Sequence, residues 1–159
     1  MTVLSDIDIE NALQSGALGI KPFIKKNLTP NGYDLSIDEV YIKKTDIKIH
    51  EGVAVIPPQT WFAISTKECV RMGEQITSQL WIRSSYARKG VLASFGKVDA
   101  GFCGTLTFGC FNAGHKPLEI PIGDRFCQIV FEHLSTVADE LYEKRSGTYQ
   151  NQRGVTLKV

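Results

Sequence analysis

An acidic turn near the middle of the chain carries the residues best suited to chemistry. Asp99 lies in the glycine-flanked segment 96–102, with Lys97 before it and Phe102 after it. A carboxylate at a tight turn can act as a general base toward water. The Lys97 ammonium can meet a phosphate, and the Phe102 ring offers a flat face to a sugar or a base. A turn aspartate and a core phenylalanine are the ordinary alternatives, and these residues alone do not exclude them.

A second polar segment follows an apolar, strand-like stretch. Arg83, Ser84, Ser85 and Arg88 combine two hydroxyls and two guanidinium groups at the start of an expected helical turn. Together with backbone N–H groups, such a set can cradle an anion such as a polyphosphate. A helix N-cap with solvated arginines explains the same residues equally well.

Two further polar residues stand beside or within apolar stretches. Asp34 follows the turn Asn31-Gly32 and enters a strand. It is either an Asx-type turn residue or an acid that orders water around a phosphate-bound Mg²⁺, since Mg²⁺ keeps several waters and needs few carboxylates. Gln128 interrupts the apolar run 126–131, where a solvent-facing side chain is the ordinary interpretation. The sequence contains no zinc-deaminase pattern, no P-loop and no dinucleotide-binding glycine fingerprint.

The spacing of apolar segments predicts a mainly β protein. Ser5 and Asp8 form a capping-box-like start to a single N-terminal helix that ends at Gly16. A loop then runs to residue 32, and a second short helical turn is expected over 84–89. Strands separated by glycine and proline turns are expected at 41–42, 47–49, 53–56, 61–64, 80–82, 106–111, 118–120 and 126–131. Many short strands with one helix indicate an antiparallel sandwich or a distorted jelly roll.

Length and composition indicate one intracellular domain. The chain has 159 residues, of which 43% are hydrophobic and 22% charged, with a net charge of +1. Bulk charge therefore gives no reason to expect a polymeric nucleic acid partner, and the absence of a long apolar run predicts no membrane partner. The four cysteines form no Cys-x-x-Cys pair, so we expect buried free thiols and a cytoplasmic protein. We predict one β domain over 1–144 and a mobile tail over 145–159.

The order of these segments resembles the five successive motifs of the dUTPase and dCTP deaminase superfamily. They read Gly-Tyr-Asp-Leu at 32–35, Arg-Ser-Ser-x-Ala-Arg at 83–88, Val-Asp-Ala-Gly-Phe-x-Gly at 98–104, Arg-x-x-Gln at 125–128 and Tyr-Gln-Asn-Gln-x-Gly at 149–154. The N-terminal helix and the tail look more like the dCTP deaminase branch. The resemblance implies a dUTPase-like β-clip or jelly-roll fold, a homotrimer with active sites between subunits, and a deoxynucleoside triphosphate bound with Mg²⁺.

The resemblance also implies a role for each polar residue. Asp99 would lie at the 3′-hydroxyl of the deoxyribose and activate the attacking water, and Phe102 would stack under the sugar. Tyr149 and Gln152 would close the tail over the nucleotide, and Asp34 would contact Mg²⁺ through water. The residues implied to hold the substrate's phosphates are Ser84, Ser85, Arg88 and Gln128. Arg83 and Lys97 are expected to bind the substrate as well, and Arg88 is also expected to assist catalysis.

Position 109 distinguishes the two branches of the superfamily. In dCTP deaminases the strand after the Asp turn resembles Asp-x-Gly-x-x-Gly-x-x-x-x-Glu, and that Glu shuttles protons to the cytosine ring. Counted from Asp99, this place falls on Gly109. Glycine has no titratable group, and a general acid or base typically contributes about 10²–10⁴-fold in rate. The nearest acids in the sequence, Glu119 and Glu132, lie beyond a turn or on another strand, so neither can take the place of that Glu without a large shift in strand register. The sequence therefore predicts a dUTP diphosphatase, with a dCTP deaminase, monofunctional or bifunctional, and a non-catalytic nucleotide-binding regulator as the alternatives.

Overall fold

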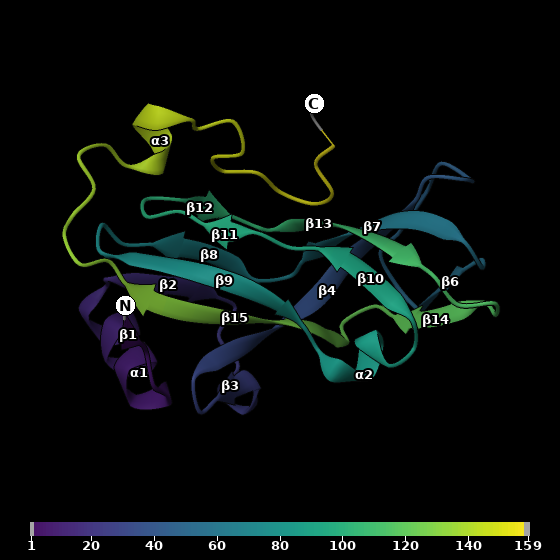
Figure 1. The fold of residues 1–159 in the computed structure, drawn as a ribbon, viewed down its shortest axis with the longest axis horizontal. Helices are drawn as coiled ribbons and strands as arrows, with labels where there is room; N and C mark the ends of the chain where they lie inside the picture. The colour runs from purple at the N-terminus through teal and green to yellow at the C-terminus, as the bar shows by residue number, and fades with distance from the viewer. Residues whose placement is uncertain (1, 158–159) are drawn as a thin grey trace.

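The computed structural model describes residues 2–157, and strands dominate it, as the apolar pattern predicts (Figure 1). The helical elements are α1 (Asp6–Ser15), the 3₁₀ turn η1 (Lys25–Asn27), α2 (Ser84–Ala87) and α3 (Tyr142–Arg145). The strands are β1 (Thr2–Val3), β2 (Leu18–Lys21), β3 (Leu28–Thr29), β4 (Gly32–Ile42), β5 (Ile47–Ile49), β6 (Val53–Ile56), β7 (Thr60–Thr66), β8 (Cys69–Met72), β9 (Ile76–Ile82), β10 (Val91–Ser94), β11 (Lys97–Val98), β12 (Cys103–Gly104), β13 (Thr107–Asn112), β14 (Leu118–Pro121) and β15 (Arg125–His133).

One long strand joins the two halves of a curled antiparallel sheet. The main path runs β10-β13-β7-β4-β15-β9-β11. The first part of β4 pairs with β15, and its second part, from Ile37 onward, pairs with β7. Because β4 changes partners along its length, the sheet folds around a single core. Smaller sheets, β12-β8-β2 and β14-β6, close its ends.

Alternating burial along the strands explains why they form and where the core lies. In β13 the side chains of Phe108, Cys110 and Asn112 are buried, whereas positions 107, 109 and 111 are partly exposed. This period of two is expected for a strand with one face on the core. The aromatic rings of Tyr33 on β4 and Phe62 on the neighbouring strand β7 are fully buried in this core.

The N-terminal helix confirms the predicted capping signals. The Ser5 hydroxyl accepts a hydrogen bond from the Asp8 amide, and the Asp8 carboxylate accepts one from the Ser5 amide. Gly16 ends the helix with a φ of 77°, a left-handed conformation that glycine adopts without steric cost. Ile9 is the helix residue that is fully buried.

The predicted elements were incomplete in several places. The expected loop before residue 32 contains β2, η1 and β3, and the strand expected at 41–42 is only the end of β4. The short strands β1, β8, β10, β11 and β12 were also missed. These strands are too short to show a clear period. Pairing with distant strands stabilises β2 on β8 and β10 on β13, whereas β3 forms a tight hairpin with β4. The helix α3, which reaches the first residue of the predicted tail, was missed as well.

The cysteine prediction was half right. All four are free thiols, but only Cys110 and Cys127 are buried. Cys69 and Cys103 are partly exposed because they lie on the outer face of β8 and β12, where the next residues, Val70 and Gly104, are the buried ones. Within residues 2–157, no helix is long and apolar enough to cross a membrane.

Candidate active site

The Asp99 turn forms one wall of a pocket of about 390 Å³. The Asp99 side chain is exposed. The Phe102 ring is buried and packs edge-on against the Tyr142 ring, with 5.5 Å between the ring centres. The turn is closed by a hydrogen bond from the Phe102 amide to the Asp99 carbonyl, 3.1 Å long. The predicted site residues that line this pocket are Lys97, Asp99, Phe102, Tyr149 and Gln152. The structure thus brings five predicted residues together around an acid and an aromatic wall.

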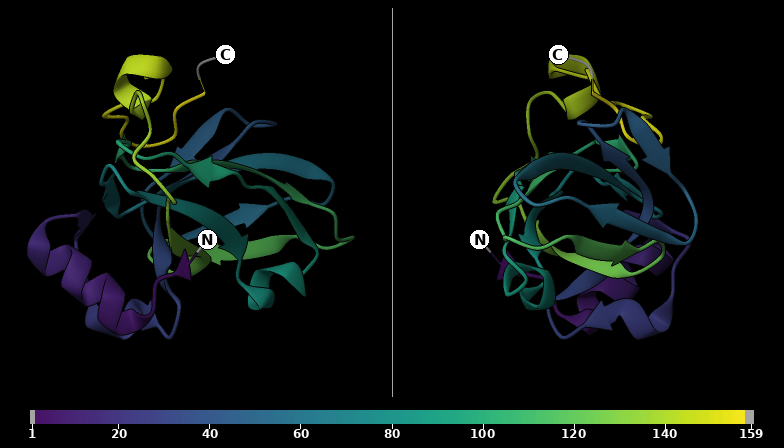
Figure 2. Two further views of the ribbon diagram at one scale, coloured as in Figure 1. Left: turned by 60° about the vertical axis from the view of Figure 1, so that its left-hand side comes forward. Right: turned by 90° about the vertical axis from the view of Figure 1, so that its right-hand side faces the viewer.

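The tail lies directly on this pocket. The Asn151 amide donates to the Cys103 carbonyl at 2.7 Å, and the Gln152 side-chain amide donates to the Thr105 carbonyl at 2.7 Å. The Gln150 side chain accepts from the Cys103 amide, so the tail follows β12 and the start of β13. The yellow tail lies over these strands in all three views (Figures 1 and 2). Its mobility stays a prediction.

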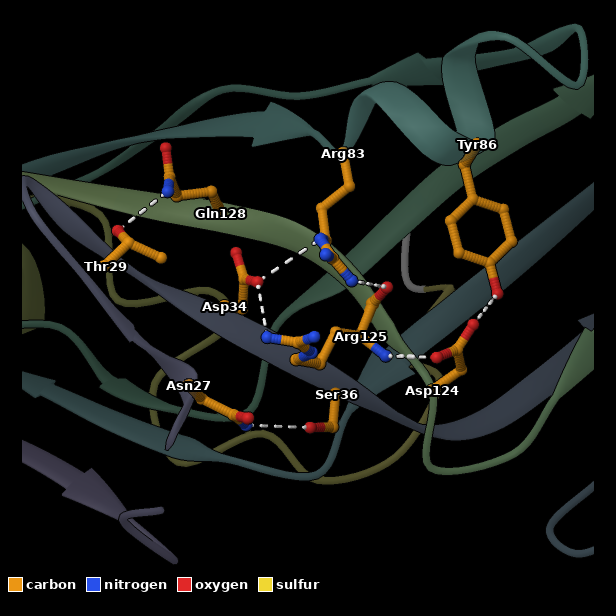
Figure 3. Close-up of polar contacts among 9 residues, drawn as sticks. All are labelled: Asn27, Thr29, Asp34, Ser36, Arg83, Tyr86, Asp124, Arg125 and Gln128. Carbon is orange, nitrogen blue, oxygen red and sulfur yellow. Dashed lines mark hydrogen bonds and ion pairs between the residues drawn. The ribbon is translucent and has the colours of Figure 1, made fainter. Parts of the chain in front are cut away.

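A separate cluster contains Asp34, Arg83, Arg125 and Gln128 (Figure 3). The Asp34 Oδ2 atom lies 3.2 Å from the Arg83 Nε and 3.3 Å from the Arg125 Nη1. Burial raises the pKa of Asp34, and the Arg83 and Arg125 guanidinium groups oppose that rise. Gln128 pairs directly with Asp34 across β15 and β4, and its side-chain amide donates to the Thr29 hydroxyl at 2.8 Å.

The two serines and the second arginine of the 83–88 motif lie on and just after α2. Ser84, Ser85 and Arg88 are exposed, whereas Tyr86 is buried and donates its hydroxyl hydrogen to Asp124 at 2.7 Å. Arg83 caps the helix with its backbone in an extended conformation. The hydroxyls and the Arg88 guanidinium are therefore accessible to a ligand, while Tyr86 anchors the turn to the core.

Within one protomer, these two groups do not meet. Arg83, Ser84, Ser85, Arg88 and Gln128 are absent from the lining of the Asp99 pocket. In every view α2 lies low on the molecule, while the tail and β12 lie at the top (Figures 1 and 2). A single chain therefore presents an acid-and-aromatic pocket and a separate hydroxyl-and-guanidinium surface.

Lys97 has a partner that the sequence did not indicate. Its ammonium lies 3.3 Å from the Glu132 carboxylate, which also accepts a hydrogen bond from Gln79 at 2.9 Å. The pairing of β11 and β15 with β9 places Glu132 close to the Asp99 turn although 33 positions separate the two acids in the sequence. Glu132 is held by these two contacts and does not line the pocket.

Gly109 lies in regular strand geometry, opposite Ala63 on β7 and Ser94 on β10. There is no bulge at this position. A Cβ atom at Gly109 would lie 3.4 Å from both the Cζ2 and the Nε1 atoms of the Trp61 indole. The place that the resemblance assigns to a proton-shuttling acid is therefore covered by an aromatic ring.

The described residues do not form a resident metal centre. No group of three or more His, Cys, Asp or Glu side chains within 2–157 could hold a metal ion. One Asp34 oxygen is already shared by two guanidinium groups. The contact of Asp34 with Mg²⁺ through water accordingly stays a prediction, and no protein cage for Mg²⁺ exists in this part of the chain.

The sequence missed several residues around the pocket. Tyr142, Ser146 and Thr148 also line it, because α3 and the following turn fold back over the Asp99 loop. Glu39, on β4, anchors the tail by accepting a hydrogen bond from the Val155 amide at 2.9 Å. A charged residue within an apolar strand was the available signal for Glu39, whereas no local signal marked the α3 residues.

The curled β fold and the ordered motif residues are those expected of the dCTP deaminase and dUTPase superfamily. The dCTP deaminase-like family model matches residues 3–134, and the chain belongs to this family, within the dCTP deaminase and dUTPase superfamily. Both the predicted superfamily and the predicted fold are therefore confirmed.

Three relatives illustrate both activities of the superfamily. A dCTP deaminase of Thermococcus gammatolerans is 40% identical over 140 residues, which is 87% of each chain. A probable deoxyuridine 5′-triphosphate nucleotidohydrolase of Sulfolobus islandicus rod-shaped virus 1 is 34% identical and covers 98% of this chain and 97% of its own. A dUMP-forming dCTP deaminase of Dictyoglomus thermophilum is 32% identical, with 97% and 92% covered.

Solved structures agree on the fold. The dCTP deaminase of Agrobacterium tumefaciens aligns with a TM-score of 0.70 and 17% identity, covering 81% of this chain and 47% of that one. A mutant dUTPase from phage phi11 of S. aureus aligns with a TM-score of 0.55 and 20% identity, covering 77% and 94%. At these identities the likeness concerns the fold alone.

Proposed function

We propose that this protein is a dUTP diphosphatase, which converts dUTP and water into dUMP and pyrophosphate. The observation that carries the proposal is the pair formed by Gly109 and Trp61. An indole ring covers the position where the deaminase pattern places its proton-shuttling Glu, while the Asp99 and Phe102 pocket is retained. Hydrolysis of a phosphoanhydride requires a positioned water and cationic donors rather than an acid beside the pyrimidine.

In the proposed reaction, Asp99 accepts a proton from a water that attacks the α-phosphorus in line with the leaving pyrophosphate. The new P–O bond forms as the bond between the α- and β-phosphates breaks, and pyrophosphate leaves with the bonding electron pair. Phe102 supports the deoxyribose, and its buried ring leaves little space for a 2′-hydroxyl. Lys97, on the rim of the same pocket, adds positive charge near the phosphates. Mg²⁺ enters with the triphosphate and is held mainly by the phosphate oxygens.

The phosphate-binding residues are proposed to come from a second copy of the chain. Ser84, Ser85 and Arg88 are exposed but lie apart from the Asp99 pocket of their own protomer. A homotrimer would place this surface against the pocket of a neighbour, which is how the resemblance arranges the site. In that arrangement Arg88 stabilises the negative charge that develops on the phosphates.

Complementation tests the shared site directly. Asp99→Asn and Arg88→Ala are each expected to abolish pyrophosphate release when the variants are purified separately. Unfolding and refolding them together should restore part of the activity, because a mixed oligomer contains some sites with both native residues. Two inactive variants that stay inactive after verified mixing would argue that each site lies within one chain.

The alternative with a specific observation in its favour is a dCTP deaminase, since the Thermococcus relative bears that name at 40% identity. Incubation of the purified protein with Mg²⁺ and either dUTP or dCTP separates the candidates. We expect pyrophosphate and dUMP from dUTP and no ammonia from dCTP. Ammonia from dCTP would refute the monofunctional diphosphatase, and dUTP binding without any product would favour a regulator of the same fold.

A further inference from the structure

A second pocket, of about 530 Å³, adjoins the Asp99 pocket. The two pockets share Thr107, Tyr149 and Gln152. Thr107 and Gly109 lie on the same face of β13, and two residues of a strand span about 7 Å. That distance suits a pyrimidine ring that extends from a sugar in the first pocket into the second. The residues that line the second pocket are Tyr41, Lys43, Trp61, Thr107, Gly109, Tyr149, Gln152, Thr156 and Leu157.

Trp61 is the largest side chain of this second pocket, and its neighbours fix its orientation. It pairs with Phe111 across β7 and β13, so that Gly109 is its diagonal neighbour on the same face. The Tyr41 ring packs edge-on against the indole at 6.5 Å, and the Lys43 ammonium lies 5.7 Å from the centre of the indole. The indole consequently lies over Gly109 with its Nε1 atom at the glycine.

The indole N–H of Trp61 has no hydrogen-bond acceptor among residues 2–157, although the ring is partly buried. An indole N–H can only donate a hydrogen bond. A ligand that fills this pocket is therefore best matched when it presents an acceptor at this point. A carbonyl oxygen meets this requirement, and an amino group does not.

We infer that Trp61 selects uracil over cytosine by donating a hydrogen bond from Nε1 to the O4 carbonyl of the base. This inference rests on the proposed function, because it assigns the base of dUTP to the second pocket. Uracil has a carbonyl acceptor at ring position 4, whereas cytosine has an amino group that can only donate there. A cytosine ring in the same pose would leave two donors facing each other and both unsatisfied, which is the kind of mismatch that discriminates strongly between ligands.

Gly109 leaves room beside the indole. A Cβ atom at that position would already be in van der Waals contact with the indole, 3.4 Å from two ring atoms, so the further atoms of a longer side chain would have to displace the ring. The chain thus has a donor for a carbonyl oxygen at the place where the deaminase pattern has an acid that acts on the amino-bearing carbon.

The test measures binding rather than turnover. The affinities of non-hydrolysable α,β-imido-dUTP and α,β-imido-dCTP are determined by calorimetry with Mg²⁺ for the wild type and for Trp61→Phe, which keeps an aromatic ring and removes the N–H. We expect the wild type to bind the uracil analogue more tightly than the cytosine analogue. In Trp61→Phe the ratio of the two affinities should fall about tenfold, equivalent to about 1.4 kcal/mol, mainly because the uracil analogue binds more weakly. Trp81→Phe is the matched control, because Trp81 is exposed on β9 and lines neither pocket.

A second variant keeps the inference testable if Trp61→Phe does not fold. Gly109→Val leaves the indole chemically intact but displaces it from the strand, so it should reduce the same ratio of affinities. An unchanged ratio in a folded Trp61→Phe variant, or in Gly109→Val if that is the folded one, would overturn the inference. Equal binding of both analogues to the wild type would overturn it too, without touching the proposed hydrolysis. Conversely, absence of pyrophosphate release from dUTP would refute the proposed function while a Trp61-dependent preference for the uracil analogue still supported the inference.

Discussion

Glu39 is expected to control how firmly the tail stays on the protein. Its carboxylate is almost fully buried, at 6% exposure of the side chain, and its Oε1 atom accepts from the Val155 amide at 2.9 Å. Lys48 lies 3.1 Å from the same oxygen, and His50 lies 3.3 Å from the other. Val155 is itself buried, so its amide has no access to water when the tail is docked.

The magnitude follows from the state of that amide. In Glu39→Ala the buried Val155 N–H loses its acceptor, which costs about 1–3 kcal/mol. Lys48 and His50 add little, because both are largely exposed and their attraction to Glu39 is screened by solvent. The docked population should fall by a factor of about 5 to 150. Glu39→Gln keeps an oxygen acceptor and loses only its charge, so we expect about a fivefold effect.

Hydrogen exchange measured residue by residue provides the assay. Exchange of the Val155 amide should accelerate by these factors in the two variants, while amides in β15 keep their protection, because local opening is separate from global unfolding. Glu51→Ala is the matched control, since Glu51 is an exposed acid near the same strands. Equal protection of Val155 in the wild type and in Glu39→Ala would refute the reasoning and assign the anchoring to the other tail contacts.

Three further predictions concern catalysis and stability. Asp99→Asn should lower the turnover of dUTP by about 10²–10⁴-fold with nucleotide affinity largely kept; activity near the wild-type level would remove Asp99 from the role of base. Burial raises the pKa of Glu68 above its ordinary 4.5, and the hydrogen bond from the Ser36 amide opposes that rise. The contribution of Glu68 to the unfolding free energy is therefore complete below pH 4.5 and is lost as the pH rises through the raised pKa. The unfolding free energy of Glu68→Gln minus that of the wild type, measured by urea denaturation, should therefore grow from pH 4 to pH 8. A difference that stays constant with pH would contradict this. Tyr86→Phe removes the 2.7 Å hydrogen bond to Asp124 and should cost about 1.5 kcal/mol of unfolding free energy, with Asp124→Asn as a milder comparison; an unchanged midpoint would show that solvent replaces the bond.

Local signals were sufficient for the parts of the molecule that depend on neighbours in sequence. The reciprocal bonds of Ser5 and Asp8 and the left-handed Gly16 are contacts within four residues or properties of one residue, so they could be predicted. Turn residues, together with apolar residues at every second position, predicted at least part of most of the longer strands. Some strands of two to four residues, such as β2, β8 and β10, escaped, because their stability comes from partners far along the chain.

By itself, the sequence determined the superfamily and the chemical types of the site residues, because the ordered motifs are local strings of letters. It also determined the loss of the acid at position 109. The tertiary structure decided what stands in that place, since Trp61 reaches Gly109 only through the register of β7 on β13. It likewise decided that Asp34 is paired with Arg125, 91 positions away in the sequence. Register between distant strands decides which side chains meet, and no local pattern encodes it.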